Sequence, residues 1–174
     1  MSGIATVTAQ YVRKVEGTGS IIIDTRKTTP GMRFLEKEAV RIGGGANHRM
    51  GLYDMIMLKD NHIDYAGGIR NAIAKTHDYL LKTGLKLKIE VESRSLEDVK
   101  EILATGGIDR IMLDNFSVPL TAEAVKLING QTETESSGGI TLANVRDYAE
   151  CGVDFISIGA LTHHIKSLDL SLKA

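Results

Sequence analysis

The chain has 174 residues, of which 43% are hydrophobic and 25% are charged, and its formal net charge is −1 at pH 7. Such a composition predicts one soluble domain with a substantial core, and the balanced charge argues against a broad electrostatic footprint for nucleic acid or an anionic membrane. The single cysteine, Cys151, excludes an intramolecular disulfide and a multi-thiolate metal site, and it fits a reducing cytoplasm. No apolar stretch approaches membrane-spanning length, and the N-terminus lacks the pattern of a signal peptide.

Short apolar runs alternate along the chain with stretches of helical periodicity. The first stretch, residues 2–15, fits a helix better than a strand, and glycines end it. A short element is also expected around residues 168–172. The predicted strands cover residues 20–23, 55–58, 86–91, 110–113, 132–135 and 155–158, and the helices between them cover residues 32–42, 69–81, 96–103, 121–128 and 142–149.

Strict alternation of six strands and five helices predicts a parallel sheet with right-handed crossovers. Each predicted strand ends in charged, hydroxyl or glycine residues. In a barrel these ends share one mouth, whereas an open sheet would spread them along an edge. We therefore predict a parallel α/β barrel of six to seven strands. Because a regular barrel has eight, this barrel is expected to be incomplete or open. Residues 1–19 form a helical segment leading into it, and residues 20–174 form the barrel domain.

The first strand ends in the segment Asp24-Thr25-Arg26-Lys27-Thr28-Thr29-Pro30-Gly31. Pro30 is well placed to open the following helix. Adjacent Arg and Lys side chains can clamp a carboxylate or a phosphate, Arg as a bidentate fork and Lys as a mobile charge. The alternative is a solvated charge pair in a loop.

The other strand ends indicate an anionic ligand. Two glycine turns there resemble a backbone phosphate cradle, although most such turns are only turns. The acidic side chains can hold Mg²⁺, bind sugar hydroxyls or stabilise developing positive charge, or simply cap the next helix. The residues concerned are the cations Arg49 and Lys59, the acids Glu92 and Asp114, and the turns Ser137-Gly138-Gly139 and Gly159-Ala160.

The five histidines have different expected roles. His48 follows a glycine loop and is a candidate positioned donor, whereas His62 is expected to brace its loop and His77 to be exposed on a helix. His163 or His164 can reach a phosphate or serve a structural role. No spacing of histidines and carboxylates indicates a zinc site.

Seven motifs stand in the order found in the nicotinate-nucleotide pyrophosphorylase family, also called quinolinate phosphoribosyltransferase, which this chain resembles over nearly its whole length. They are the segment of residues 24–31, Gly43-Gly44-Gly45-Ala46-Asn47-His48-Arg49, Leu58-Lys59-Asp60-Asn61-His62, Glu90-Val91-Glu92, Leu113-Asp114-Asn115-Phe116, Ser137-Gly138-Gly139-Ile140 and Gly159-Ala160-Leu161-Thr162.

The resemblance implies that quinolinate and phosphoribosyl pyrophosphate react, with substrate-associated Mg²⁺ and no organic cofactor, to give nicotinate mononucleotide, pyrophosphate and CO₂ in NAD biosynthesis. It implies that Lys27, Lys59, Glu92 and Asp114 are catalytic, with the two acids meeting ribose hydroxyls or Mg²⁺. The substrate-binding residues that it implies are Thr25, Arg26, His48, Arg49, Ser137, Gly138, Gly139, Gly159, Ala160 and His163.

The resemblance also implies a cytoplasmic homodimer or higher homo-oligomer, completed by an N-terminal domain that is missing here. We therefore expect weak or no activity from this polypeptide alone, and association through apolar surface. Two alternatives remain. One is a phosphate-binding barrel fragment without turnover, and the other is a ModD-type relative that acts on another base.

Overall fold

The structure, a computed structural model, describes residues 1–166 and 171–173. The element expected around residues 168–172 falls largely outside the described residues. Among the described helices, none is long and apolar enough to cross a membrane.

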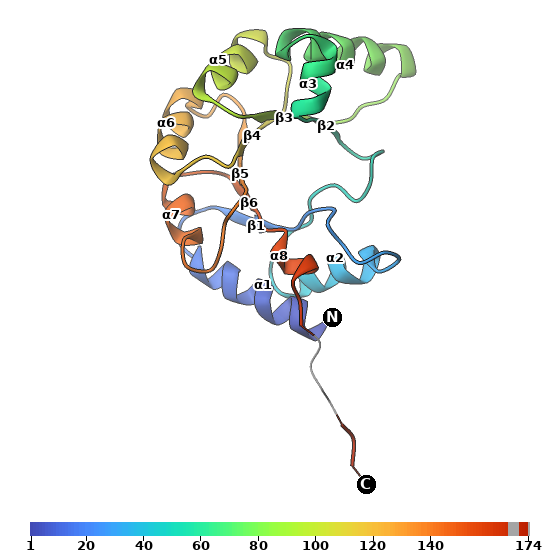
Figure 1. Ribbon diagram of the computed structural model, residues 1–174, viewed down its shortest axis with the longest axis vertical. Helices are drawn as coiled ribbons and strands as arrows, with labels where there is room; N and C mark the ends of the chain where they lie inside the picture. The colour runs from blue at the N-terminus through green and yellow to red at the C-terminus, as the bar shows by residue number, and fades with distance from the viewer. Residues whose placement is uncertain (167–170, 174) are drawn as a thin grey trace.

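Six parallel strands form one sheet, in the order β1-β6-β5-β4-β3-β2. Figure 1 shows them as an arc with helices around its outside, so the barrel class and the strand number are confirmed within the described part of the chain. The arc does not close, because β1 and β2 are its two unpaired edges. The strands are β1 (Ile21–Ile23), β2 (Ile56–Leu58), β3 (Ile89–Ser93), β4 (Arg110–Asp114), β5 (Glu133–Ser137) and β6 (Phe155–Ser157).

The helices follow the predicted periodicity, with two additions. The segment after β2, read from the sequence as a polar loop, is a helix of its own, α3, and a four-residue helix, α8, follows β6. The full set is α1 (Ser2–Lys14), α2 (Arg33–Ile42), α3 (Asp60–Ala66), α4 (Ile69–Thr83), α5 (Leu96–Thr105), α6 (Val118–Ile128), α7 (Val145–Glu150) and α8 (Ala160–His163).

Two strand predictions were displaced toward the N-terminus. The strand predicted over residues 86–91 is β3, which begins at Ile89 and ends at Ser93, and the one predicted over residues 132–135 is β5, which ends at Ser137. The sequence argument ended the first of these strands at its last apolar residue, Val91, and the second before the serines that lead into the glycine turn. Parallel strands are covered on both faces, however, so polar side chains that find partners continue the ladder.

The open side of the arc is crossed by the segment between α2 and β2, residues 43–55, which Figure 1 places between the two edge strands. Ala46 forms an isolated parallel bridge with Ile23, and its N–H donates to Ile22 O over 2.8 Å. A loop therefore occupies the position where a further strand would close the barrel.

Candidate active site

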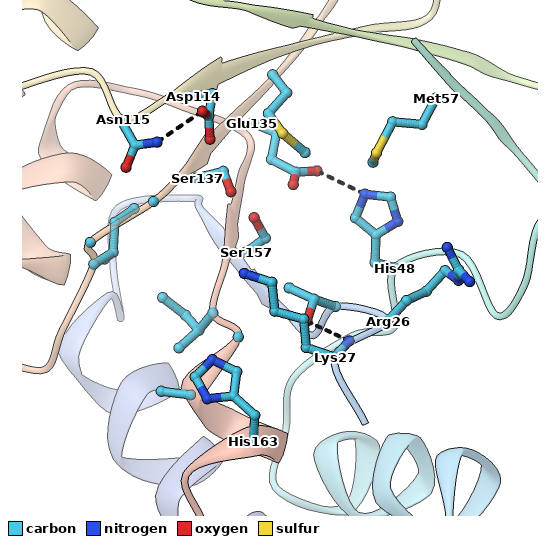
Figure 2. A pocket seen from close by; sticks show the side chains of 18 of the residues that line it. Arg26, Lys27, His48, Met57, Asp114, Asn115, Glu135, Ser137, Ser157 and His163 are labelled. Atoms are coloured by element: carbon cyan, nitrogen blue, oxygen red, sulfur yellow. Dashed lines mark hydrogen bonds and ion pairs between the residues drawn. The ribbon is translucent and has the colours of Figure 1, made fainter. Parts of the chain in front are cut away.

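A cavity of about 800 Å³ lies at the carboxyl ends of the strands. Figure 2 shows Arg26 and His48 on one side of it, with Asp114 and Ser137 on the other. All of the predicted site residues line this cavity except Glu92. The fold thus brings together side chains from both halves of the chain, as barrel geometry requires.

The segment after β1 presents Arg26 and Lys27 to the cavity. The backbone of Lys27 is held twice, because its N–H donates to Thr25 Oγ1 over 3.1 Å and its carbonyl accepts from Thr162 Oγ1 over 2.6 Å. The Nε atom of Arg26 is buried and has no hydrogen-bond partner among the described residues. This segment is therefore ordered while its cationic groups stay available to a ligand.

Arg49 enters from the loop that crosses the open side. Its Nη1 donates to Met55 O over 3.1 Å, and its backbone N–H donates to His48 Nδ1 over 2.6 Å. Burial, and then the charge of Arg26, lower the pKa of Arg49. Two guanidinium groups are thus held close enough to repel each other, and a bound dianion would relieve that repulsion.

Lys59 and Glu92 form an ion pair of 2.9 Å between the ends of β2 and β3. The Glu92 side chain is only 7% exposed and lies within β3, not in a loop after it. His62 accepts the Lys59 N–H at Nδ1 over 3.1 Å, which confirms the predicted bracing role. Glu92 therefore reaches the cavity through Lys59.

The glycine turn after β5 fits closely against the end of β4. Gly138 has φ +94°, and a Cβ there would lie 2.2 Å from Asn115 Oδ1. Asn115 in turn donates from Nδ2 to Asp114 Oδ2 over 2.8 Å. Only glycine fits this position, and its absent side chain leaves backbone facing the cavity.

The turn after β6 also requires glycine, but for a different reason. The φ of Gly159 is −63°, so conformation does not require glycine. A Cβ would, however, lie 2.8 Å from His163 Nε2 and 3.5 Å from the Lys27 side chain. His163 lines the cavity, whereas His77, predicted to be exposed, is half-buried against Gly107.

Beneath the cavity lies a buried polar cluster that the sequence argument did not assign. His48 Nε2 lies 3.0 Å from Glu90 Oε2 and 3.5 Å from Glu135 Oε2, and Arg110 donates to Glu135 Oε2 over 3.0 Å. Glu90 Oε1 and Glu135 Oε1 are buried without a donor among the described residues. A proton retained on one carboxyl group would supply such a donor.

The electrostatics of this cluster agree with a retained proton. Burial, and then the charge of Glu90, raise the pKa of Glu135 to about 8. Burial also raises the pKa of Glu90 and lowers that of His48. The cluster is therefore expected to hold a protonated carboxyl group and a neutral imidazole at neutral pH.

His48, Glu90 and Glu135 also bring three metal-ligand atoms within 4.8 Å of one another. The hydrogen bonds argue against a metal there. Since Nδ1 of His48 accepts the Arg49 N–H, the hydrogen-bond pattern assigns the ring proton of the neutral imidazole to Nε2. That nitrogen faces the two carboxyl groups and has no free lone pair for a metal ion.

A sequence signal for these buried carboxylates did exist. Glu90 lies inside an apolar strand, one residue from Val91 and two from Glu92, so two acids share one face of that strand. In a parallel strand covered on both faces, such acids must be buried and paired. The cavity residues that the argument missed are Met57, Met112, Asn115, Glu135, Ile140, Thr141, Ser157 and Ile158, whereas His164 was named with His163 and also lines the cavity.

A family model described as "Quinolinate phosphoribosyl transferase, C-terminal domain" matches residues 4–173. The chain belongs to this family. It is 51% identical to the nicotinate-nucleotide pyrophosphorylase [carboxylating], chloroplastic, of Arabidopsis thaliana, and 48% identical to the probable nicotinate-nucleotide pyrophosphorylase [carboxylating] of Bacillus subtilis. These alignments cover 99% of this chain but 53% and 58% of the relatives, so the chain spans about half the length of the curated relatives it matches.

Solved structures agree with this membership of the quinolinate phosphoribosyl transferase C-terminal domain family. NadC from Streptococcus pyogenes superposes with a TM-score of 0.91 at 44% identity, over 99% of this chain and 59% of that one. Nicotinate-nucleotide pyrophosphorylase from Francisella tularensis gives a TM-score of 0.90 at 44% identity, over 98% and 59%. The open parallel sheet is therefore a feature shared with the family.

Proposed function

We propose that this chain carries the catalytic barrel of a decarboxylating quinolinate phosphoribosyltransferase, which makes nicotinate mononucleotide, pyrophosphate and CO₂ from quinolinate and phosphoribosyl pyrophosphate. The observation that carries the proposal is one cavity with Arg26 and His48 on one side and Asp114 and Ser137 on the other, lined also by Arg49 and by the two glycine turns. Family membership and the names of the relatives support the same reaction.

The charges of the cavity suit two anionic substrates. A dicarboxylate and a polyphosphate repel each other, and cations between them offset the repulsion. In this assignment Arg26, His48 and Arg49 face the quinolinate carboxylates, with His48 contributing from the edge of its buried cluster. Lys27 and Lys59 lie between the two substrates.

The donor side of the cavity suits the phosphoribosyl group. Ser137, the two glycines after it and the Gly159-Ala160 turn line the cavity, and backbone N–H groups at such turns suit a phosphate. Thr25 and His163 also line the cavity and are assigned to substrate binding. Displacement at the anomeric carbon develops positive charge on the ribose, which the carboxylates of Glu92 and Asp114 stabilise. Positioning and electrostatics account for this step, and it needs no covalent nucleophile.

Magnesium belongs to the proposal as an ion carried by the phosphoribosyl donor. Glu92 and Asp114 end neighbouring strands, and each has one carboxylate oxygen without a donor among the described residues. Oxygen ligands of this kind fit Mg²⁺. When bound, the ion would offset charge on the pyrophosphate leaving group.

The oligomeric state and the location are parts of the same proposal. A homodimer or higher homo-oligomer, completed by an N-terminal domain, is supported by exposed apolar side chains such as Phe34 and Tyr53, which are 72% and 73% exposed. A cytoplasmic location is supported by the bacterial relative, although some plant relatives are named chloroplastic or mitochondrial.

Product formation tests the proposal directly. The chain is incubated with quinolinate, phosphoribosyl pyrophosphate and Mg²⁺, alone and with the N-terminal part of a longer relative, and nicotinate mononucleotide is followed by chromatography. We expect more product after the addition, and its loss in Lys27→Met but not in Lys126→Met, an exposed position on α6 outside the cavity. No product under either condition would refute the proposal.

A further inference from the structure

Lys37 is a fully buried charge that the proposed reaction does not use. It lies on α2, its side chain is 0% exposed, and it forms an ion pair with Asp24, whose side chain is also 0% exposed. Its Nζ also donates to the backbone carbonyl of His48 over 3.0 Å. A single ammonium group thus contacts the end of β1 and the loop that crosses the open side of the sheet.

Asp24, at the end of β1, also bonds directly to the loop that crosses the open side of the sheet. Its Oδ1 accepts the backbone N–H of His48 over 2.9 Å, and its Oδ2 accepts from Asn47 Nδ2 over 2.6 Å. Asn47 Nδ2 also donates to Lys37 O over 2.8 Å. Asp24 is two residues before Arg26, and His48 is adjacent to Arg49, so this network lies at the base of both arginines.

Stability alone gives a weak reason for this arrangement. Burying two charges costs desolvation energy that their attraction often does not recover, and neutral replacements of similar size are often equally stable. The network does what an apolar contact cannot, because each bond has a direction. It sets the position of one loop relative to one strand end where no sheet ladder continues between them.

The need for such positioning is specific to this side of the cavity. The turns at the ends of β5 and β6 are extensions of paired strands, so backbone hydrogen bonds place them. The His48 and Arg49 segment has no strand partner beyond the single bridge at Ala46. Side-chain bonds must therefore hold Arg49 near Arg26 against their mutual repulsion.

We propose that Lys37 and Asp24 are positioning residues that hold the two arginine-bearing segments at the spacing needed to bind an aromatic dicarboxylate. This inference rests on the proposed function, because it assigns the Arg26 and Arg49 side of the cavity to quinolinate. Lys37 and Asp24 do not line the cavity themselves. The inference predicts that their network controls the affinity for the dicarboxylate and not the affinity for phosphoribosyl pyrophosphate.

The test removes both charges together, since removing one alone would leave the other buried and unpaired. The variant is Asp24→Asn with Lys37→Met, and its matched control is Glu38→Gln with Arg41→Met, which removes an exposed ion pair of 2.9 Å from the same helix. A milder variant, Asn47→Ala, removes two hydrogen bonds at a half-buried position. Calorimetry then measures the binding of quinolinate and, separately, of phosphoribosyl pyrophosphate with Mg²⁺.

We expect the double variant to lose at least tenfold in quinolinate affinity and Asn47→Ala to lose several-fold, while phosphoribosyl pyrophosphate affinity stays within twofold for both. The control should match the wild type for both ligands. Unchanged quinolinate affinity, or an equal loss for the two ligands, would overturn the inference, because general loss of structure weakens both.

Hydrogen exchange separates failure of this inference from failure of the proposed function. In the unliganded double variant, the backbone amides of His48 and Arg49 should exchange at least tenfold faster than in the wild type, while that of Asn115, which donates to Ser137 O, should not change. If the wild type binds no quinolinate even with the N-terminal part of a longer relative added, the proposed function is wrong. Unchanged exchange at His48 and Arg49 would refute the positioning role independently.

Discussion

Replacement of Glu135 by Gln should reverse a pH-dependent loss of stability. Glu135 is fully buried, and its pKa is about 8 in the folded chain against an ordinary value of 4.5. A difference of this size corresponds to at most about 5 kcal/mol at full ionisation. Since Glu135 is only partly ionised at pH 8, and Glu90, His48 and Arg110 share the cluster, we expect roughly 2–3.5 kcal/mol to appear between pH 5 and pH 8.

The sign follows from the protons bound in each state. Between about pH 4.5 and pH 8 the folded chain keeps the Glu135 proton while the unfolded chain has lost it, so the free energy of unfolding falls as the pH rises through this window. Above pH 8 the loss is complete. Gln cannot ionise, it keeps an oxygen for Arg110, and its amide can donate to Glu90. The variant should therefore show little of the decline.

Urea denaturation at pH 5.0, 6.5 and 8.0 measures this difference. The wild type should lose roughly 2–3.5 kcal/mol from pH 5.0 to pH 8.0 relative to Glu135→Gln. The matched control is Glu133→Gln, on the same strand and also paired with Arg110, because the pKa of Glu133 is lowered by Arg110 and Lys88 despite partial burial. That variant should keep the decline. Parallel pH profiles for the wild type and Glu135→Gln would show that Glu135 is ionised throughout and would refute this reasoning.

Three further predictions concern the cavity and the surface. Gly138→Ala should lower the free energy of unfolding by about 1–3 kcal/mol, because φ is +94° and the new Cβ meets Asn115, and unchanged stability in urea denaturation would contradict it. Lys59→Gln should slow nucleotide formation at least tenfold with a small change in melting temperature, because Glu92 loses its cation, and a wild-type rate in the product assay would refute that role. Phe34→Ser should reduce self-association in concentration-dependent sizing chromatography, since that side chain is 72% exposed, and a monomeric wild type at high concentration would rule out the apolar contact.

The sequence predicted the barrel class because its apolar runs recur between helical stretches, and that pattern depends on local periodicity. It placed the candidate residues correctly at one mouth for the same reason: Arg26, Lys59 and Asp114 each follow or end an apolar run, and parallel strands point their ends the same way. The sequence therefore predicted most of the cavity lining without any knowledge of contacts.

The buried charged groups that the sequence argument missed depend on contacts between distant residues. Glu90 and Glu135 are 45 positions apart and come together only when β3, β4 and β5 pair, with Arg110 between them. The Lys37 and Asp24 ion pair likewise needs the packing of α2 against the end of β1. Local rules assign such charges to the surface, so a buried network cannot be read from periodicity.

The opening in the sheet divides the cavity into parts that can change at different rates during evolution. The turns after β5 and β6, which the proposed function assigns to the phosphate, extend from strands that pair on both sides, so substitutions there disturb the ladder itself. The loop across the opening, which carries His48 and Arg49, is tied mainly by side chains. Under the proposed function, substitutions in that loop can alter which aromatic acid is recognised while the turns assigned to the sugar phosphate stay intact. If that function is correct, a barrel with one strand position occupied by a loop can accept a new base while it keeps the same phosphoribosyl donor.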